Sequence, residues 1–188
     1  TLDAILDNVS QALLQAGIFR SIMIALVDRA TNTVEVVTSV VAFESGGRAR
    51  RLRNESIGVE VKTGAIGLSY SLDDDNITAQ VARTGKMAVI SEWNERLDAR
   101  VDTKKNWATG GAEGKVAYFI PLIYGDEVIA VVATGSLPEE QRQVLERIEM
   151  IQPLLDLVAA SLHHARQTRD LEDAHRRLVD LHEISRLT

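Results

Sequence analysis

The residues best suited to act as general bases or metal ligands are four histidines, and all lie in the C-terminal part of the sequence: His163, His164, His175 and His182. His163 and His164 are neighbours, and neighbouring residues on a helix point about 100° apart, so they cannot chelate one ion together. The chain has no cysteine, which excludes thiolate nucleophiles, thiolate metal ligands and disulfides. It also lacks Gly-x-Ser-x-Gly and Gly-x-x-x-x-Gly-Lys motifs. We therefore expect this chain not to be an enzyme.

Two charged clusters are candidates for ion binding. Arginines at positions 48, 50, 51 and 53 could bind an anion, although a run of charge is usually a solvated loop, which is the interpretation we favour. Three consecutive aspartates, Asp73–Asp75, could bind a divalent cation. Their spacing is not that of an EF-hand loop, and short acidic residues often cap a helix N-terminus. We expect them to cap a helix that begins near Asn76.

Aromatic side chains could contact a small ligand. Trp93 and Trp107 lie in one long loop, where their indoles could pack on a flat ligand or could anchor the loop with their N–H groups satisfied locally. Tyr118 lies in a predicted strand, on the same face as Ile120, and its hydroxyl needs a partner if it is buried. A polar atom of a ligand is one candidate, but we expect a backbone carbonyl.

Hydrophobic periodicity and turn residues predict the elements that position these side chains. The N-terminal helix is expected to end at Gly17, and the last helix to begin at Pro138 and to bend at Pro153. The predicted helices cover residues 2–13, 76–84 and 138–162. The predicted strands cover 18–27, 33–41, 58–61, 68–72, 87–91, 115–123 and 128–134, with long loops over 43–66 and 92–114.

This order of elements predicts an α+β fold with a central antiparallel sheet of five or six strands. The two terminal helices are amphipathic and are expected on one face, with the short helix and the long loops on the other. Loops this long in a compact domain are usually functional or disordered, so we expect a ligand pocket between them and the sheet. The residues predicted to line that pocket are Ile77, Val81, Ile90, Trp93, Trp107, Tyr118 and Ile120.

The composition changes after Leu162. Charged residues are dense from Gln167 to His182, and the apolar residues there have the spacing of a coiled-coil seam: Leu171, Ala174, Leu178 and Leu181. A lone helix of this kind is marginal in water, so we expect a second copy to cover it. We predict a sensory domain over residues 1–165 and a relay helix over 166–188, with Leu162 at its base. Because the chain begins at a threonine and stops inside a helical pattern, we expect a piece of a longer protein with a further domain downstream.

The overall composition excludes several partners. A formal net charge of −6 and an aromatic content of 4% are poorly suited to nucleic acid, which needs clustered cations and stacking surfaces. No apolar run approaches the roughly 20 residues of a membrane helix, and no signal peptide precedes the first helix. Absence of cysteine fits a reducing compartment. We expect a cytoplasmic segment with no membrane contact of its own, whose parent protein could be anchored elsewhere.

Two segments resemble motifs of the GAF family of sensory domains. One is Ile77–Lys86 followed by Val89 and Ile90, and the other is Tyr118–Val131. The helix after Pro138 is in the expected place, so the resemblance spans residues 2–166. It implies a sheet-based sensor that binds a small molecule on one face and dimerises through its terminal helices.

The resemblance leaves the ligand unknown. The Asn-Lys-Phe-Asp-Glu pattern of cyclic-nucleotide receptors is not found, and both covalent bilin attachment and methionine sulfoxide reduction need cysteine. Haem-binding members use a pocket histidine, which is lacking here, so neither haem nor a metal is expected. The leading hypothesis is a non-catalytic domain that binds a small molecule or partner and relays its state through a dimerising helix to an output module, with a sensor histidine kinase of a two-component system as the candidate parent. The alternatives are a ligand-free dimerisation module and an enzyme of the same fold.

Overall fold

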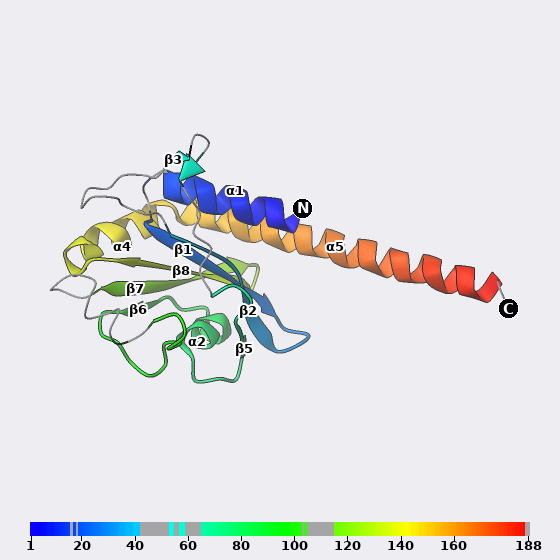
Figure 1. Cartoon of the computed structure of the whole chain (residues 1–188), viewed down its shortest axis with the longest axis horizontal. Coiled ribbons are helices and arrows are strands. Elements are labelled where there is room, and N and C mark those ends of the chain that lie inside the picture. The colour runs from blue at the N-terminus through cyan, green and yellow to red at the C-terminus, as the bar shows by residue number, and fades with distance from the viewer. Residues whose placement is uncertain are drawn as a thin grey trace.

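The computed structural model describes residues 1–15, 17, 19–41, 53–54, 57–58, 65–102, 104 and 115–186 (Figure 1). Its helices are α1 (Leu2–Gln15), α2 (Ile77–Thr84), the short 3₁₀ turn η1 (Pro138–Glu140), α4 (Gln141–Met150) and α5 (Gln152–Arg186). Its strands are β1 (Ser21–Asp28), β2 (Thr33–Val41), β3 (Arg53–Asn54), β4 (Ile57–Gly58), β5 (Ser69–Ser71), β6 (Ala88–Ile90), β7 (Val116–Tyr124) and β8 (Glu127–Ser136).

Six strands form one antiparallel sheet in the order β5-β2-β1-β8-β7-β6, which confirms the predicted fold class. The two predicted hairpins are its centre, and β1 pairs with β8 to join them. In the β7–β8 turn Gly125 has a φ of 61°, a left-handed conformation that glycine adopts without strain. Strands β3 and β4 pair separately as a two-stranded antiparallel sheet. Of the predicted strand over 58–61, residues 59–61 lie outside the described residues.

The sheet is covered on both faces, and successive residues of its strands belong to different layers. In β7, Val116, Tyr118 and Ile120 pack in the cluster with α1, α4 and α5, whereas Ala117 and Phe119 pack in the cluster with α2. The terminal helices therefore share one face, as predicted, and α2 and the described part of the following loop cover the other. This burial on both sides explains why β1 and β8 are apolar almost throughout.

Two helix boundaries follow from single residues. Helix α2 ends at Gly85, whose φ of 64° lets its amide return to the carbonyl of Val81. Helices α4 and α5 are separated at Ile151, and Pro153 is the second residue of α5, where its missing N–H costs no helical hydrogen bond. The predicted bend at Pro153 is therefore a break just before it.

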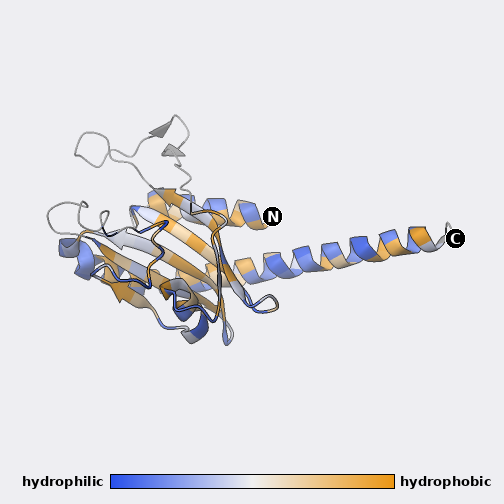
Figure 2. Ribbon diagram, turned by 60° about the horizontal axis from the view of Figure 1, so that its bottom comes forward, coloured by the Kyte–Doolittle hydropathy of each residue, from blue (hydrophilic) through white to orange (hydrophobic). Residues whose placement is uncertain are grey.

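Helix α5 is 35 residues long and extends well beyond the sheet (Figure 1). Leu162 is only 1% exposed and packs in the helix-side core. From Gln167 onward almost all described side chains are exposed, over a length of roughly 30 Å at 1.5 Å per residue. Apolar and polar segments alternate along this extension (Figure 2). None of the helices in the described ranges is both long and apolar enough to cross a membrane.

Candidate functional site

A small hollow lies between the sheet, α2 and the loop that follows β6. The space inside it that a water-sized sphere can occupy is about 10 Å³, and it is partly open to solvent. Phe119 lines it from the sheet, Ile77 and Thr78 from α2, and Leu97 and Val101 from the loop. This volume is room for about one water molecule, far below the range of roughly 300–1,000 Å³ that small-molecule sites occupy. A small-molecule ligand would therefore fit this place only after movement of the loop.

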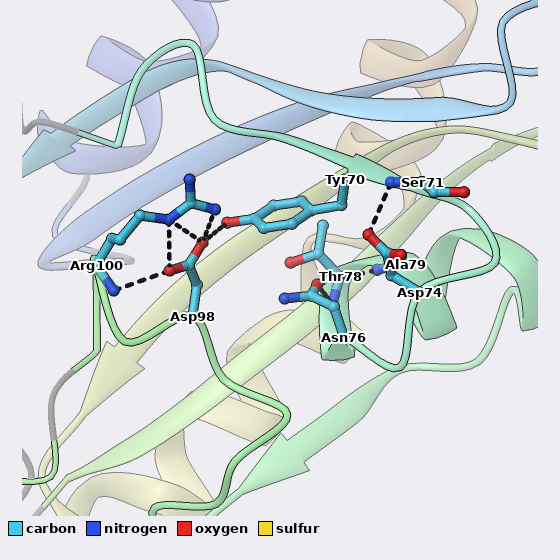
Figure 3. Close-up of polar contacts among 8 residues, drawn as sticks. All are labelled: Tyr70, Ser71, Asp74, Asn76, Thr78, Ala79, Asp98 and Arg100. Carbon is cyan, nitrogen blue, oxygen red and sulfur yellow. Dashed lines mark hydrogen bonds and ion pairs between the residues drawn. The ribbon is translucent and has the colours of Figure 1, made fainter.

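A tyrosine and an aspartate form one polar wall of the hollow, and an arginine outside its lining binds the same aspartate (Figure 3). The Tyr70 hydroxyl, on β5, donates to Asp98 Oδ2 in the loop at 2.6 Å. Arg100 closes the same carboxylate from the other side, with Nη2 at 2.6 Å from Oδ2 and Nε at 2.9 Å from Oδ1. The Asp98 side chain is 10% exposed, whereas that of Arg100 is 61% exposed. The Tyr70–Asp98 hydrogen bond is therefore the more shielded of the two contacts, and it fixes the loop to the sheet edge.

The electrostatics of this wall suit structural support better than proton transfer. Burial by itself raises the pKa of the Asp98 carboxyl, but hydrogen bonds from Arg100 and Tyr70 outweigh it and hold the pKa at about 2. Burial, together with the adjacent carboxylate, raises the pKa of the Tyr70 phenol above its usual range. At neutral pH Asp98 is therefore an ionised acceptor and Tyr70 a neutral donor.

Further contacts hold the loop against α2. The Arg96 carbonyl accepts a hydrogen bond from the Ile77 amide at 3.1 Å, and the Arg96 guanidinium pairs with Asp75 at 2.8 Å. The Trp93 indole donates from Nε1 to the Asp102 carbonyl at 2.8 Å. Of the two roles considered for Trp93, the structure shows the anchoring contact within the loop.

Asn76, and not the aspartates before it, caps α2. Its Oδ1 accepts from the amides of Thr78 and Ala79, because only the residue directly before the first helical turn can reach them (Figure 3). The expectation that Asp73–Asp75 cap this helix is therefore wrong. Their carboxylates bind other partners: Asn32 for Asp73, the Ser71 amide for Asp74 and Arg96 for Asp75.

The residues predicted to line the pocket do not form one site. Ile77 lines the hollow, and Val81, Ile90 and Trp93 belong to the apolar cluster on the same face. Tyr118 and Ile120 lie in the cluster on the opposite face of the sheet, because the side chains of even-numbered residues of β7 point toward the terminal helices. Trp107 and the arginines at 48, 50 and 51 lie outside the described residues.

Tyr118 has a partner within the core. Its hydroxyl lies 2.8 Å from Ser136 Oγ, which donates its own proton to the Leu137 carbonyl, so Tyr118 is the donor. The partner of the Tyr118 hydroxyl is therefore a serine hydroxyl and not the backbone carbonyl that we expected. Burial raises the pKa of the Tyr118 phenol. This side chain supports the packing of β7 on the helices.

The polar wall formed by Tyr70 and Asp98 was not among the residues predicted from the sequence. Tyr70 and Asp98 are separated by 28 positions, and no recognised motif contains either residue. The only local signal is the short Asp-x-Arg spacing of Asp98 and Arg100, which also occurs in ordinary solvated loops.

On the other face of the sheet, Arg166 is, among the described residues, the last of α5 that contacts the domain before the exposed extension begins. Its guanidinium donates to the Val27 carbonyl and pairs with Asp28 Oδ1 at 3.1 Å. Beyond it the predicted seam is exposed, with Leu171 at 72%, Leu178 at 66% and Leu181 at 62%. Leu162 differs from these seam residues because it is buried in the domain and anchors the helix.

Two histidines of α5 contact an aromatic ring of the β7–β8 hairpin. The His163 ring stacks on Tyr124 with the ring centroids 4.4 Å apart, and His164 approaches the same ring edge-on at 5.7 Å. These contacts add to the packing of α5 on the end of the hairpin.

Comparison with known proteins identifies the family. The GAF domain profile matches residues 1–163. Comparison with curated proteins gave no match. Similar solved structures include the GAF-B domain of DevS from Mycobacterium smegmatis, with 14% identity, a TM-score of 0.53 and coverage of 91% of this chain and 99% of that one. The GAF domain of a phosphoenolpyruvate-protein phosphotransferase from Coxiella burnetii has 15% identity and a TM-score of 0.55, covering 90% and 87%. That of a two-component sensor histidine kinase from Bacillus halodurans has 15% identity and a TM-score of 0.54, covering 89% and 97%. This chain therefore belongs to the GAF domain family, whose members are sensory and regulatory domains of signalling proteins.

Proposed function

We propose that this GAF domain binds a small molecule or a partner beside α2 and relays its state through a dimerising α5 to an output module of a two-component sensor kinase. The observation that carries the proposal is the extension of α5, whose exposed leucines have no cover among the described residues. A structure similar to this one comes from a sensor histidine kinase, which supports that parent. Any ligand must bind the two states of the domain with different affinity to shift their populations.

The exposed apolar stripe on α5 is longer than the seam seen in the sequence. Leu157 is 63% exposed and lies two heptads before Leu171, on the same face of one continuous helix. A second copy packed along this stripe would bury it from the body of the domain outward. That geometry would link the position of the domain directly to the spacing of the two helices.

Sedimentation velocity on stripe variants tests the dimer. Leu171→Asp and Leu178→Asp place a charge in the proposed seam and should convert the dimer to a monomer. Val179→Asp is the matched control, because Val179 is also an exposed apolar residue of the same helix, at 43%, but lies one position off the stripe. It should leave the association unchanged. A wild-type chain that stays monomeric at high concentration would contradict the relay.

Ligand binding is tested separately by thermal shift. A ligand present at about 100 times its Kd stabilises the folded state by roughly 2.7 kcal/mol, which raises the Tm of a chain of this size by roughly 5–10 °C. Metabolite and nucleotide panels are the probes. Variant Thr78→Trp, which fills the hollow, should abolish any shift that a pocket ligand causes.

One observation favours the alternative of a ligand-free dimerisation module. The polar side chains around the hollow already satisfy one another: Tyr70 and Arg100 bind Asp98, and Arg96 binds Asp75. A ligand would gain little from groups that are already paired. Dimerisation without any thermal shift across the panels would establish this second function.

A further inference from the structure

The turn between β1 and β2, residues Asp28–Asn32, contacts both layers of the domain. It lies at the end of the sheet from which α5 extends (Figures 1 and 2). We propose that this turn couples α2 and the segment before it to the base of α5. The inference rests on the proposed role of α5 as the relay helix, and it assigns the residues that connect the ligand-side layer to that helix.

On one side the turn holds α5. Asp28 Oδ1 pairs with Arg166 at 3.1 Å, and Arg166 also donates to the carbonyl of the preceding residue, Val27. The same Asp28 oxygen accepts the Ala30 amide at 2.9 Å and so also shapes the turn. Arg166 is therefore bound to an atom whose position depends on the conformation of the turn.

On the other side the turn holds α2 and the segment before it. Arg29 Nη2 donates to the Ala82 carbonyl at 2.9 Å, and carbonyls of the last helical turn have no partner within the helix. Asn32 has a φ of 56°, and its carbonyl accepts a hydrogen bond from the Leu72 amide at 2.9 Å. Its Nδ2 donates to Asp73 Oδ2 at 2.7 Å. Both contacts bind the chain between β5 and α2.

These contacts are carried by residues next to one another in sequence. Asp28 and Arg29 share a peptide bond but bind elements on opposite faces of the sheet, so a shift of α2 that moves Arg29 also changes the position of the Asp28 carboxylate. The two faces of the sheet interior pack mainly in apolar clusters, whereas the turn contacts both layers through charged side chains. Because it lies at the ends of β1 and β2, the turn can contact both layers without crossing the apolar interior.

Amide hydrogen exchange on the whole chain tests the coupling from both ends. Arg29→Ala removes the contact to α2, and we expect exchange of the α5 amides around Arg166 to rise about fivefold, the effect of losing one hydrogen bond of ordinary net strength. Reciprocally, Arg166→Ala should raise exchange at the Leu72 amide and in the last turn of α2. Linkage requires that the two effects be similar in size.

A double-mutant cycle provides an independent readout. For uncoupled sites, the fold-changes in the unfolding equilibrium constant multiply to within about twofold. We expect the Arg29→Ala/Arg166→Ala pair to deviate more than about threefold. Arg20→Ala is the matched control: it breaks an ion pair to Glu140 at the other end of β1, and should multiply with Arg29→Ala. If Arg29→Ala does not fold, Arg29→Lys replaces it.

The proposal is overturned by two results together. Each substitution would change amide exchange only in the layer that it contacts, and the fold-changes of Arg29→Ala and Arg166→Ala in the unfolding equilibrium constant would multiply as those of the control pair do. Neither measurement needs a ligand or a dimer. A chain that proves monomeric and ligand-free would refute the proposed function and leave this coupling standing, whereas a dimeric, ligand-binding chain with uncoupled arginines would refute only the coupling.

Discussion

Ser10 is a fully buried serine in the apolar layer between α1 and the sheet. It lies on the buried face of α1 with Leu6 and Leu13 and is 1% exposed, and its Oγ has no hydrogen bond among the residues that the structure describes. A buried unpaired hydroxyl costs about 1–3 kcal/mol, because it loses water and gains nothing in return. Ser10→Ala removes only that oxygen and improves helix propensity. We expect it to raise the free energy of unfolding by about 1–2 kcal/mol.

Urea unfolding followed by circular dichroism measures this change, at one protein concentration so that association does not alter the comparison. The Tm should rise by roughly 2–8 °C, given about 2–4 °C per kcal/mol for a chain of this size. Ser161→Ala is the matched control, because Ser161 Oγ already donates to the Leu157 carbonyl at 2.9 Å on α5. It should change stability by less than about 0.5 kcal/mol. A Ser10→Ala variant no more stable than the parent would show that the hydroxyl is paired in solution and that the reasoning is wrong.

Three further predictions concern the layer around α2. The pKa of Asp98 is lowered from 3.8 to about 2 in the folded chain. The ionised carboxylate therefore stabilises the folded state fully above about pH 4, and this stabilisation is lost as the pH falls to about 2. Urea titrations should show a loss of roughly 2 kcal/mol in the free energy of unfolding over this range, and Asp98→Asn should abolish it. Asn76→Ala removes the cap of α2 and should cost about 1 kcal/mol in urea unfolding. Gly85→Ala forces alanine into a left-handed conformation and should lower stability by about 1 kcal/mol by the same assay.

These three predictions have control substitutions or outcomes that would contradict them. Gly135 has no positive φ and a β-carbon there would meet only the Val116 carbonyl at 3.4 Å, so Gly135→Ala should be milder than Gly85→Ala. Asp74→Ala should leave the cap of α2 intact, since Asp74 binds the Ser71 amide. An acid transition of equal size in wild type and Asp98→Asn would assign the pH dependence to other carboxylates.

The sheet and helices could be predicted because their signals are local. Strands β7 and β8 have long apolar runs separated by a turn with glycine, and the predicted limits differ from the observed ones by at most two residues. The start of α2 was also predicted, but its cap was assigned to the wrong side chains, because Asp and Asn have similar preferences and only their distance to the first amides separates them.

The site could not be predicted to the same extent because it depends on which face of a strand meets which layer. Alternation in β7 shows that Tyr118 and Phe119 point in opposite directions, but not that Phe119 faces the loop. That assignment depends on the packing of helices far away in the sequence. The contact of Tyr70 with Asp98 is likewise a product of tertiary structure.

Because α5 is one continuous helix, it determines the orientation about its axis of any module attached to its C-terminal end. Each residue added to a straight helix turns everything downstream by about 100° and moves it by 1.5 Å, so an insertion of one residue after Arg166 would rotate any module fused to the helix by slightly more than a quarter turn. An insertion of seven residues restores the original azimuth to within about 20°. Fusions built on this domain should therefore retain their geometry only when the added helix is a whole number of heptads.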